Sequence, residues 1–287
     1  MKRFLIVDGH NLLFRMFYGM PSRINDSTGQ PVHAVVGFIG AYLKLLRLSG
    51  AEYTAVIFDG EHQSERVKLL PEYKIGRRDY SDMPPEGSPF TQLPMIKTVL
   101  DELRVYHTEA EAGMETDDVI ASCALRFAGD FEVLIASQDR DFFGLVNDSI
   151  KLFDYHGDQS VIWDAEHIRR RYGIEPEFFA DFKALTGDHS DNIRGVTGVG
   201  PKTAAQLIAK FGHFGTILEN AERIKRTNVR EAILAEAERV WMNLRLISLT
   251  DRAEPPFAEP PALTFDPAAV TTIALLEDAG ISLPRRS

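Results

Sequence analysis

The chain has 287 residues, of which 44% are hydrophobic and 26% are charged, and its formal net charge is -10. This length and balance are typical of a soluble, globular protein that buries a sizeable core in one or two domains. No apolar run approaches the roughly 20 residues of a membrane span, and no signal sequence is evident, so we expect a cytoplasmic protein without a membrane partner. The single cysteine, Cys123, excludes an internal disulfide.

Three short apolar runs, of the kind that form buried parallel strands, lead into aspartates. Helical patterns at 33–48 and 116–127 lie between them, and this order of strand, helix and strand predicts a parallel sheet with helices on both faces. Ligands bind beyond the carboxyl ends of the strands in such sheets, so these acids should meet at one edge. The runs and their acids are Phe4 to Val7 with Asp8, Ala55 to Phe58 with Asp59, and Val133 to Ala136 with Asp139 and Asp141.

Two other protein families with this architecture are alternatives. A dinucleotide-binding fold requires G-x-G-x-x-G after the first strand, whereas this chain has DGHNLL, so we set that interpretation aside. A haloacid-dehalogenase-like phosphatase also has an aspartate at the end of its first strand. That family needs a second aspartate two residues later, where this chain has His10, so the phosphatase is the weaker alternative.

The stretch from residue 61 to residue 92 loses the hydrophobic period and is predicted to leave the sheet. Its first half, SERVKLLPEYKIGRR, is basic, and a second basic cluster covers Arg169 to Arg171. A solvated basic helix is the simplest explanation of such charges. Either cluster could instead form a local positive patch that contacts phosphates in spite of the acidic total.

A second acidic group opens the helical pattern in GMETDDVIASCAL, at Glu115, Asp117 and Asp118. Acids in the first turn of a helix often serve only to complement the helix dipole. Three acids in four positions repel one another unless a cation lies between them. A metal site is therefore the second interpretation of this group.

The segment from Gly187 to Ala205, GDHSDNIRGVTGVGPKTAA, combines two carboxylates with a glycine-rich turn. Asp188 and Asp191 are three residues apart, so both can face one way and offer oxygen ligands to a divalent cation. The following glycines permit a close approach of the backbone, and Pro201 is suited to begin a helix whose first amides favour a phosphate. A helix-loop-helix corner with an aspartate cap is the alternative.

The string GVTGVGPKTA resembles the DNA-binding helical hairpin of the bacterial flap endonucleases and of the 5′→3′ exonuclease domain of DNA polymerase I. The resemblance extends roughly from residue 4 to residue 251. It implies that the turn holds a duplex backbone, with a potassium ion bound by main-chain carbonyls, and that the basic stretch forms the base of a helical arch around a single-stranded 5′ end. The DNA-binding residues that it implies are Arg15, Arg66, Tyr73, Gly198, Gly200, Lys202 and Thr203.

The same resemblance implies a metal site of nine acids, none of which has lost its carboxylate. Two divalent ions, Mg²⁺ or Mn²⁺, are the implied cofactors for attack of water on a phosphodiester. Lys74, Arg77 and Arg78 are the implied catalytic cations, which offset charge on the phosphoryl oxygens. The nine acids are Asp8, Asp59, Glu115, Asp117, Asp118, Asp139, Asp141, Asp188 and Asp191.

The predicted fold is α/β, with a parallel-sheet nuclease core over residues 1–174, an arch at about residues 61–92, and a helical DNA-binding region with a helix-hairpin-helix-like turn over residues 175–287. Residues 150–163 are predicted to form two strands. Helices are predicted at 177–185, 204–210 and 229–246, and one more after the proline-rich AEPPFAEPP. Glycine and proline at residues 87–89 argue against a continuous helix in the second half of the arch.

The predicted function is a structure-selective, metal-dependent 5′ nuclease that hydrolyses phosphodiesters at 5′ flaps and 5′ ends of DNA, in primer removal and repair. Its predicted partners are DNA with a single-stranded 5′ flap or end next to a duplex, and a DNA polymerase. A DNA-binding module without turnover is the main alternative.

Overall fold

The computed structural model describes residues 1–60, 66–75, 80, 83–84, 87–250 and 252–284. Its centre is a six-stranded sheet in the order β3-β2-β1-β4-β5-β6, in which only β6 is antiparallel to its neighbour. The predicted, mostly parallel sheet is confirmed, with β3 and β6 at its edges. The strands are β1 (Lys2–Asp8), β2 (Tyr53–Phe58), β3 (His107–Glu109), β4 (Phe131–Ala136), β5 (Ile150–Asp154) and β6 (Val161–Trp163).

Strand β1 shows why both faces of the sheet are covered. Its residues Phe4, Leu5, Ile6 and Val7 have no exposed surface. Because successive side chains of a strand point to opposite faces, Phe4 and Ile6 pack into a hydrophobic cluster with α5, while Leu5 and Val7 pack into a second cluster with the other helices. These helices are α1 (Gly9–Gly19), α2 (His33–Ser49), α4 (Leu93–Glu102), α5 (Thr116–Phe127) and α12 (Thr272–Asp278).

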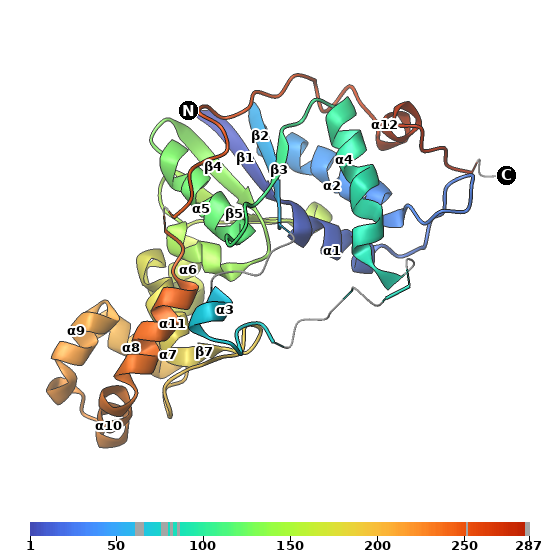
Figure 1. Ribbon diagram of the computed structural model, residues 1–287. Coiled ribbons are helices and arrows are strands. Elements are labelled where there is room, and N and C mark those ends of the chain that lie inside the picture. Colours follow the sequence, from blue (N-terminus) through green and yellow to red (C-terminus); the bar gives the residue numbers. More distant parts are fainter. Residues whose placement is uncertain (61–65, 76–79, 81–82, 85–86, 251, 285–287) are drawn as a thin grey trace.

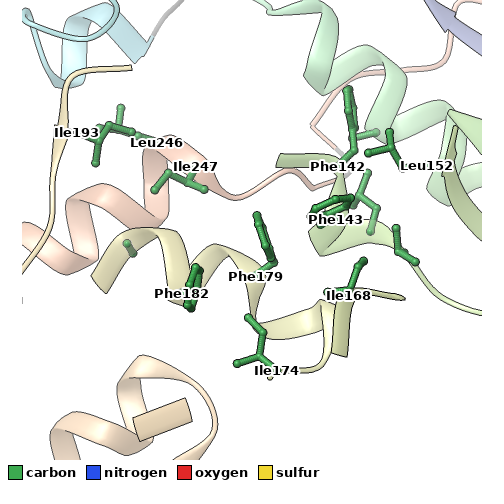
Figure 2. Close-up of a cluster of buried hydrophobic side chains, with 14 of the residues drawn as sticks. Phe142, Phe143, Leu152, Ile168, Ile174, Phe179, Phe182, Ile193, Leu246 and Ile247 are labelled. Atoms are coloured by element: carbon green, nitrogen blue, oxygen red, sulfur yellow. The ribbon is translucent and has the colours of Figure 1, made fainter. Parts of the chain in front are cut away.

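Short helices form a lobe beside the sheet (Figure 1). Figure 2 shows that a continuous set of buried side chains joins the two parts, running from Phe142 and Leu152 through Phe179 to Leu246. The elements of this lobe are therefore held by the same core as the sheet. They are α6 (Ala165–Tyr172), η5 (Pro176–Phe178), α7 (Phe179–Thr186), β7 (Gly187–Asp188), β8 (Ile193–Arg194), α8 (Pro201–Phe211), α9 (Phe214–Glu219), η6 (Ala221–Arg223), α10 (Thr227–Ala235) and α11 (Ala237–Ile247).

The predicted helices at 177–185 and 204–210 are confirmed as α7 and α8, and Pro201 is the first residue of α8. The single helix predicted over 229–246 is wrong, because α10 and α11 are separated at Glu236, whose φ of -109° and ψ of 13° are not helical. The carboxylate of Glu236 accepts a hydrogen bond from the amide of Thr197 at 2.9 Å. The hydrophobic pattern continues through this break and gave no sign of it.

The structure describes only parts of the predicted arch. Among them are the one-turn helix α3 (Arg66–Leu69), a turn to residue 75, and the 3₁₀ helix η2 (Pro89–Gln92). The predicted catalytic residues Arg77 and Arg78 lie outside the described residues.

The last segment of the chain packs against the nuclease core. The amide of Leu263 donates to the carbonyl of Glu52 at 2.8 Å, and that of Thr54 donates to the carbonyl of Pro261 at 2.9 Å. The helix predicted after the proline-rich stretch is confirmed as α12, and its residue Leu276 is fully buried. Among the described helices, none is both long and apolar enough to cross a membrane.

Candidate metal centre and nucleic-acid interface

Carboxylates from several elements lie near one another at the carboxyl edge of the sheet, and we name Asp8, Asp59, Asp117 and Asp139 the acidic cluster. Strand β1 ends at Asp8, and Asp59 follows β2 directly. Asp139 comes after β4 and begins the 3₁₀ helix η3 (Arg140–Leu145), while Asp117 lies in the first turn of α5. The charges of these groups act on one another, so the strand-end acids that are distant in sequence are neighbours in the fold.

Asp8 is only 6% exposed. Its carboxylate accepts hydrogen bonds from the amide of Asn11 at 3.0 Å, which caps α1, and from the hydroxyl of Ser137 at 2.8 Å. Burial, together with the negative charges of Asp59 and Asp139, nevertheless raises the pKa of Asp8 to about 7. The site therefore stores unfavourable negative charge.

The pKa values of two further acids are raised in the same way. Burial and the charges of Asp139 and Asp8 raise the pKa of Asp117 well above its ordinary value. Burial and the charge of Asp139 also raise the pKa of Asp141 to about 7, although Lys183 pairs with Asp141 and opposes the change. Asp139 is central to this group, and its carboxylate also caps η3 by accepting the amide of Asp141 at 2.9 Å.

The remaining acids of α5 are held by cations at the base of the arch. Arg66 donates to both carboxylate oxygens of Asp118 at 2.8 Å and lies 3.0 Å from the carboxylate of Glu115. The carboxylate of Glu115 also accepts hydrogen bonds from the ammonium of Lys74 at 2.7 Å and from the hydroxyl of Tyr73 at 3.4 Å. Arg66 is 4% exposed and Tyr73 is 5% exposed. In this structure, these two predicted DNA-binding residues hold the acids of α5 and do not lie on the surface.

The base of the arch is also joined to the loop that carries Asp191. The amide of Lys74 donates to the carbonyl of Asp191 at 3.2 Å, and the side-chain amide of Asn192 donates to the carbonyl of Glu72 at 3.0 Å. Lys74 and Asn192 both have left-handed backbones, with φ of 57° and 58°. Such conformations cost energy for residues other than glycine and persist where the surroundings fix them. The two contacts place Lys74 firmly beside the acidic cluster.

Lys183 of α7 is a site residue that the sequence analysis missed. Its ammonium pairs with Asp141 and lies 2.5 Å from the carboxylate of Asp188. Although burial opposes the change, hydrogen bonds from Lys183 and Ser190 lower the pKa of Asp188 to about 2. The only signal in the sequence was the position of a lysine in the last turn of a predicted helix that leads into Asp188, and no motif marks it.

The donor set suits hard divalent cations, because such ions prefer carboxylate oxygens. Burial, and after it the charges of neighbouring acids, raise the pKa values of Asp8, Asp117 and Asp141, and a bound cation would offset both effects. Within the part of the chain that the structure describes, no three acids gather closely enough to form a ready ligand set. Asp141 and Asp188 instead hold Lys183. The metal role of the nine acids stays a prediction.

The hairpin turn (residues 195–200) connects β8 to α8. Gly198 has the expected left-handed φ of 76°, and a side chain there would meet only Asn228, at 3.8 Å. The backbone conformation therefore requires this glycine, while the space beside it is open. A side chain at Gly200 would also meet nothing within 4 Å among the described residues. Lys202 is exposed, and Thr203 follows it in the first turn of α8.

Three residues of α11 and its cap, none of them singled out by sequence, contact the hairpin turn or the segments next to it. Glu236 accepts the amide of Thr197, and Arg239 donates to the carbonyl of Gly195 at 3.0 Å. The buried side chain of Asn243 donates to the carbonyls of residues 184 and 194 at 3.0 and 2.9 Å. These contacts fix the path of the turn before any ligand binds.

Arg15 lies on α1. Its guanidinium lies 2.7 Å from Nδ1 of His156 and 3.9 Å from the carboxylate of Asp154. The side chain is 19% exposed. Its predicted contact with DNA stays a prediction.

Comparison with known protein families gives the assignment. Residues 3–173 match the family model described as 5′-3′ exonuclease, N-terminal resolvase-like domain, and residues 174–268 match the one described as 5′-3′ exonuclease, C-terminal SAM fold. The chain belongs to the 5′–3′ exonuclease family. This confirms the resemblance carried by GVTGVGPKTA, and the phosphatase alternative is set aside.

Relatives of this 5′–3′ exonuclease family member include the thermostable DNA polymerase I of Thermus thermophilus, which is 38% identical over 245 residues. That match covers 85% of this chain but 28% of the polymerase, so the chain spans under a third of the length of such relatives. The 5′-3′ exonuclease of Aquifex aeolicus is 32% identical over 251 residues, which cover 87% of this chain and 82% of the relative.

A solved structure of a bacteriophage T5 flap endonuclease, in complex with DNA and metal ions, has the same fold. The TM-score is 0.71 at 24% identity, over 86% of this chain and 89% of the T5 chain.

Proposed function

We propose that the chain is a structure-selective, divalent-metal-dependent nuclease that hydrolyses phosphodiesters at 5′ flaps and 5′ ends of DNA, in primer removal and repair. One observation supports this most: acids from three strand ends and α5 lie near enough at one edge of the sheet for their charges to act on one another, in a member of the 5′–3′ exonuclease family. A DNA-binding module without turnover has no need of a carboxylate cluster that repels both itself and DNA. The cluster therefore favours catalysis over binding alone.

We assign the metal-binding role to the nine acids in two groups. When bound, Mg²⁺ or Mn²⁺ supplies Lewis acidity and an activated water for phosphodiester hydrolysis. Lys183 pairs with one oxygen of Asp141 and with one of Asp188, so a cation would either displace its ammonium or use the second oxygen of each carboxylate. The first group contains Asp8, Asp59, Glu115, Asp117, Asp118 and Asp139, and the second contains Asp141, Asp188 and Asp191.

Lys74 is the proposed cation at the reacting phosphate. Its ammonium lies 2.7 Å from Glu115 at the border of the acidic cluster, so it can reach a phosphodiester that binds there and offset charge on the phosphoryl oxygens. Arg77 and Arg78 share this proposed role by the family resemblance. Arg66 and Tyr73 lie at the base of the arch. They would border the path of the single strand once Glu115 and Asp118 bind a metal ion instead of these two side chains.

The hairpin turn is the proposed grip on the duplex. Gly198 and Gly200 leave open space for a close approach of the DNA backbone, and Lys202 and Thr203 supply a charge and a hydroxyl for phosphates. Carbonyls of the turn would hold a potassium ion. Arg15, on α1, is proposed to guide the single strand.

A DNA polymerase is the proposed protein partner, because the chain matches a segment of several DNA polymerase I relatives. Since the proposed activity acts on DNA during replication and repair, we propose a cytoplasmic location.

The deciding experiment uses a 5′-labelled flap substrate, the parent protein, and buffers with Mg²⁺ or with chelator. Cleavage near the flap junction in Mg²⁺ alone is the expected result. A blunt duplex and a 3′ flap of the same sequence serve as controls for structure selectivity. Tight binding of the flap without cleavage in Mg²⁺ or Mn²⁺ would instead identify a binding module.

A further inference from the structure

A group of basic residues next to the hairpin turn has no role in the function proposed above. Residues 223–230, RIKRTNVR, contain four cations and no acid, in a chain whose net charge is -10. They extend from the end of η6 into the first half of α10. We name these four cations the basic patch: Arg223, Lys225, Arg226 and Arg230.

The side chains of the basic patch are available to a partner. Three of them are exposed and that of Arg230 is half-buried. None of the four forms an ion pair with a carboxylate of the described chain; Arg223 donates to the side chain of Asn220 at 3.0 Å, and Arg226 donates to the hydroxyl of Thr203 at 3.3 Å. Neutral hydrogen-bond partners orient a guanidinium without cancelling its charge.

The other basic cluster of the lobe differs in this respect. On α6, Arg169 lies 3.1 Å from the carboxylate of Glu175, and Arg170 lies 2.5 Å from that of Glu166. Two of its three arginines are therefore neutralised by their own neighbours. No cation of the basic patch has such a carboxylate partner among the described residues, although the exposed Glu222 and Glu231 flank the patch in sequence.

The position of the basic patch points to its ligand. Arg226 contacts Thr203 in the first turn of α8, and Asn228 is the residue nearest to the open space at Gly198. The patch therefore adjoins the proposed duplex grip. In Figure 1, α10 lies beside α8 at the end of the lobe that is remote from the sheet. Lys210 adds a further cation there, since its ammonium donates to the carbonyl of Arg223 at 3.1 Å.

We propose that the basic patch is a second binding site for the phosphodiester backbone of the duplex arm, farther from the cut than the hairpin turn. This inference rests on the proposed function, because it extends the same duplex. Exposed lysines and arginines that neutralise phosphates release counterions and bind without reading base sequence. The site should therefore set affinity and dependence on arm length, and not sequence preference.

The test compares the parent with the double variant Lys225→Ala/Arg226→Ala, using flap substrates in chelator over a series of salt concentrations. One substrate has a duplex arm of about 20 base pairs, roughly two helical turns, and the other has an arm of about 8 base pairs. On the long arm we expect binding to weaken about tenfold, and the slope of log Kd against log salt to fall by about two. On the short arm the two proteins should bind alike.

Two further variants complete the design. Lys225→Arg/Arg226→Lys keeps both charges and should restore binding to the long arm. Lys2→Ala/Arg126→Ala removes the same charge from the start of β1 and the end of α5, which lie at the sheet edge opposite the acidic cluster, and should bind like the parent. This control separates a local contact from the loss of net charge.

An unchanged affinity and salt slope on the long arm would overturn the inference, and so would an equal loss on both arms, or an equal loss in the control. The proposed function fails separately, if the parent does not cut a flap in Mg²⁺. A poly-glutamate peptide serves as a further probe. If it displaces DNA from the parent but not from the double variant, and the duplex arm length has no effect on DNA binding by either protein, the patch binds a protein partner and the duplex contact is overturned.

Discussion

The ammonium of Lys183 lies 2.5 Å from the carboxylate of Asp188 and pairs with Asp141 as well. A lysine thus bridges two acids that come from η3 and from β7. It supplies to both of them the positive charge that a metal ion would supply. Lys183 and a cation should therefore compete for the same oxygens.

The first prediction follows from this competition. Lys183→Met should destabilise the metal-free protein at pH 7, because Asp141 and Asp188 lose their partner, and it should lower the Mg²⁺ concentration for half-maximal thermal stabilisation several-fold. Thermal melts over a Mg²⁺ titration measure both effects. Lys151→Met is a matched control, since Lys151 pairs with Glu132 at 2.5 Å near the opposite ends of β4 and β5. A midpoint that does not fall below that of the parent would rule out competition.

The second prediction concerns pH. The pKa of Asp8 is about 7 in the folded protein against 3.8 ordinarily, so between about pH 4 and pH 7 the folded state keeps a proton that the unfolded state has released. The free energy of unfolding of the metal-free protein should therefore fall as the pH rises through this window. Asp8→Asn keeps the cap on Asn11 and should be more stable than the parent at pH 8, by roughly 1–3 kcal/mol.

Urea unfolding in chelator at pH 4 and pH 8 checks this prediction. The variant and the parent should converge at pH 4, and added Mg²⁺ should stabilise the parent more than the variant. Equal stability at pH 8 would show that Asp8 carries no excess charge in the fold.

Much of the fold follows from hydrophobic patterns, and the departures have local causes. Thr116 to Phe127 forms a helix with the predicted ends because its apolar positions recur with a helical period. Strand β3 was missed because its three residues, His107 to Glu109, are polar and only half-buried or exposed. The break at Glu236 was missed because it depends on a tertiary contact with Thr197.

The acids of the candidate site that follow strands could be predicted from the sequence, whereas the cations that pair with acids could not. Strand ends mark where Asp8 and Asp59 lie, since parallel strands share one carboxyl edge. The pairing of Arg66 with Asp118, and of Lys183 with Asp188, depends on side chains that meet only in the folded chain. A single sequence contains no periodicity that predicts such pairs.

The third prediction concerns Lys74. Lys74→Ala should slow cleavage of a flap by about two to three orders of magnitude, because a charge at the reacting phosphate contributes to the transition state. Affinity for the flap should change only modestly, since one phosphate contact among many is lost. Single-turnover rates and binding in chelator separate the two effects, with Lys68→Ala on α3 as the control. A rate like that of the parent would remove Lys74 from the site.

The fourth prediction tests the hairpin turn. Gly198→Val should weaken binding to a flap with a long duplex arm, because a β-branched residue opposes a φ of 76° and fills the open space beside the turn. Gly200→Ala is the sharper variant, since φ there is -93° and a methyl group meets nothing within 4 Å. It should leave the fold unchanged and still weaken binding. If Gly200→Ala binds like the parent, the DNA backbone does not approach that glycine.

The central claim is that the acidic cluster holds metal for cleavage, and the double variant Asp139→Asn/Asp141→Asn tests it most directly. Asn preserves the approximate shape of both side chains and the cap that residue 139 makes on η3, but a neutral amide is a poorer ligand for a hard cation. Removing two negative charges should also ease the approach of phosphates. The measurement is single-turnover cleavage of a 5′ flap in excess Mg²⁺, paired with the Kd for the same flap in chelator. We predict that the double variant binds at least as tightly as the parent and does not cut, whereas substantial residual cleavage would contradict the account.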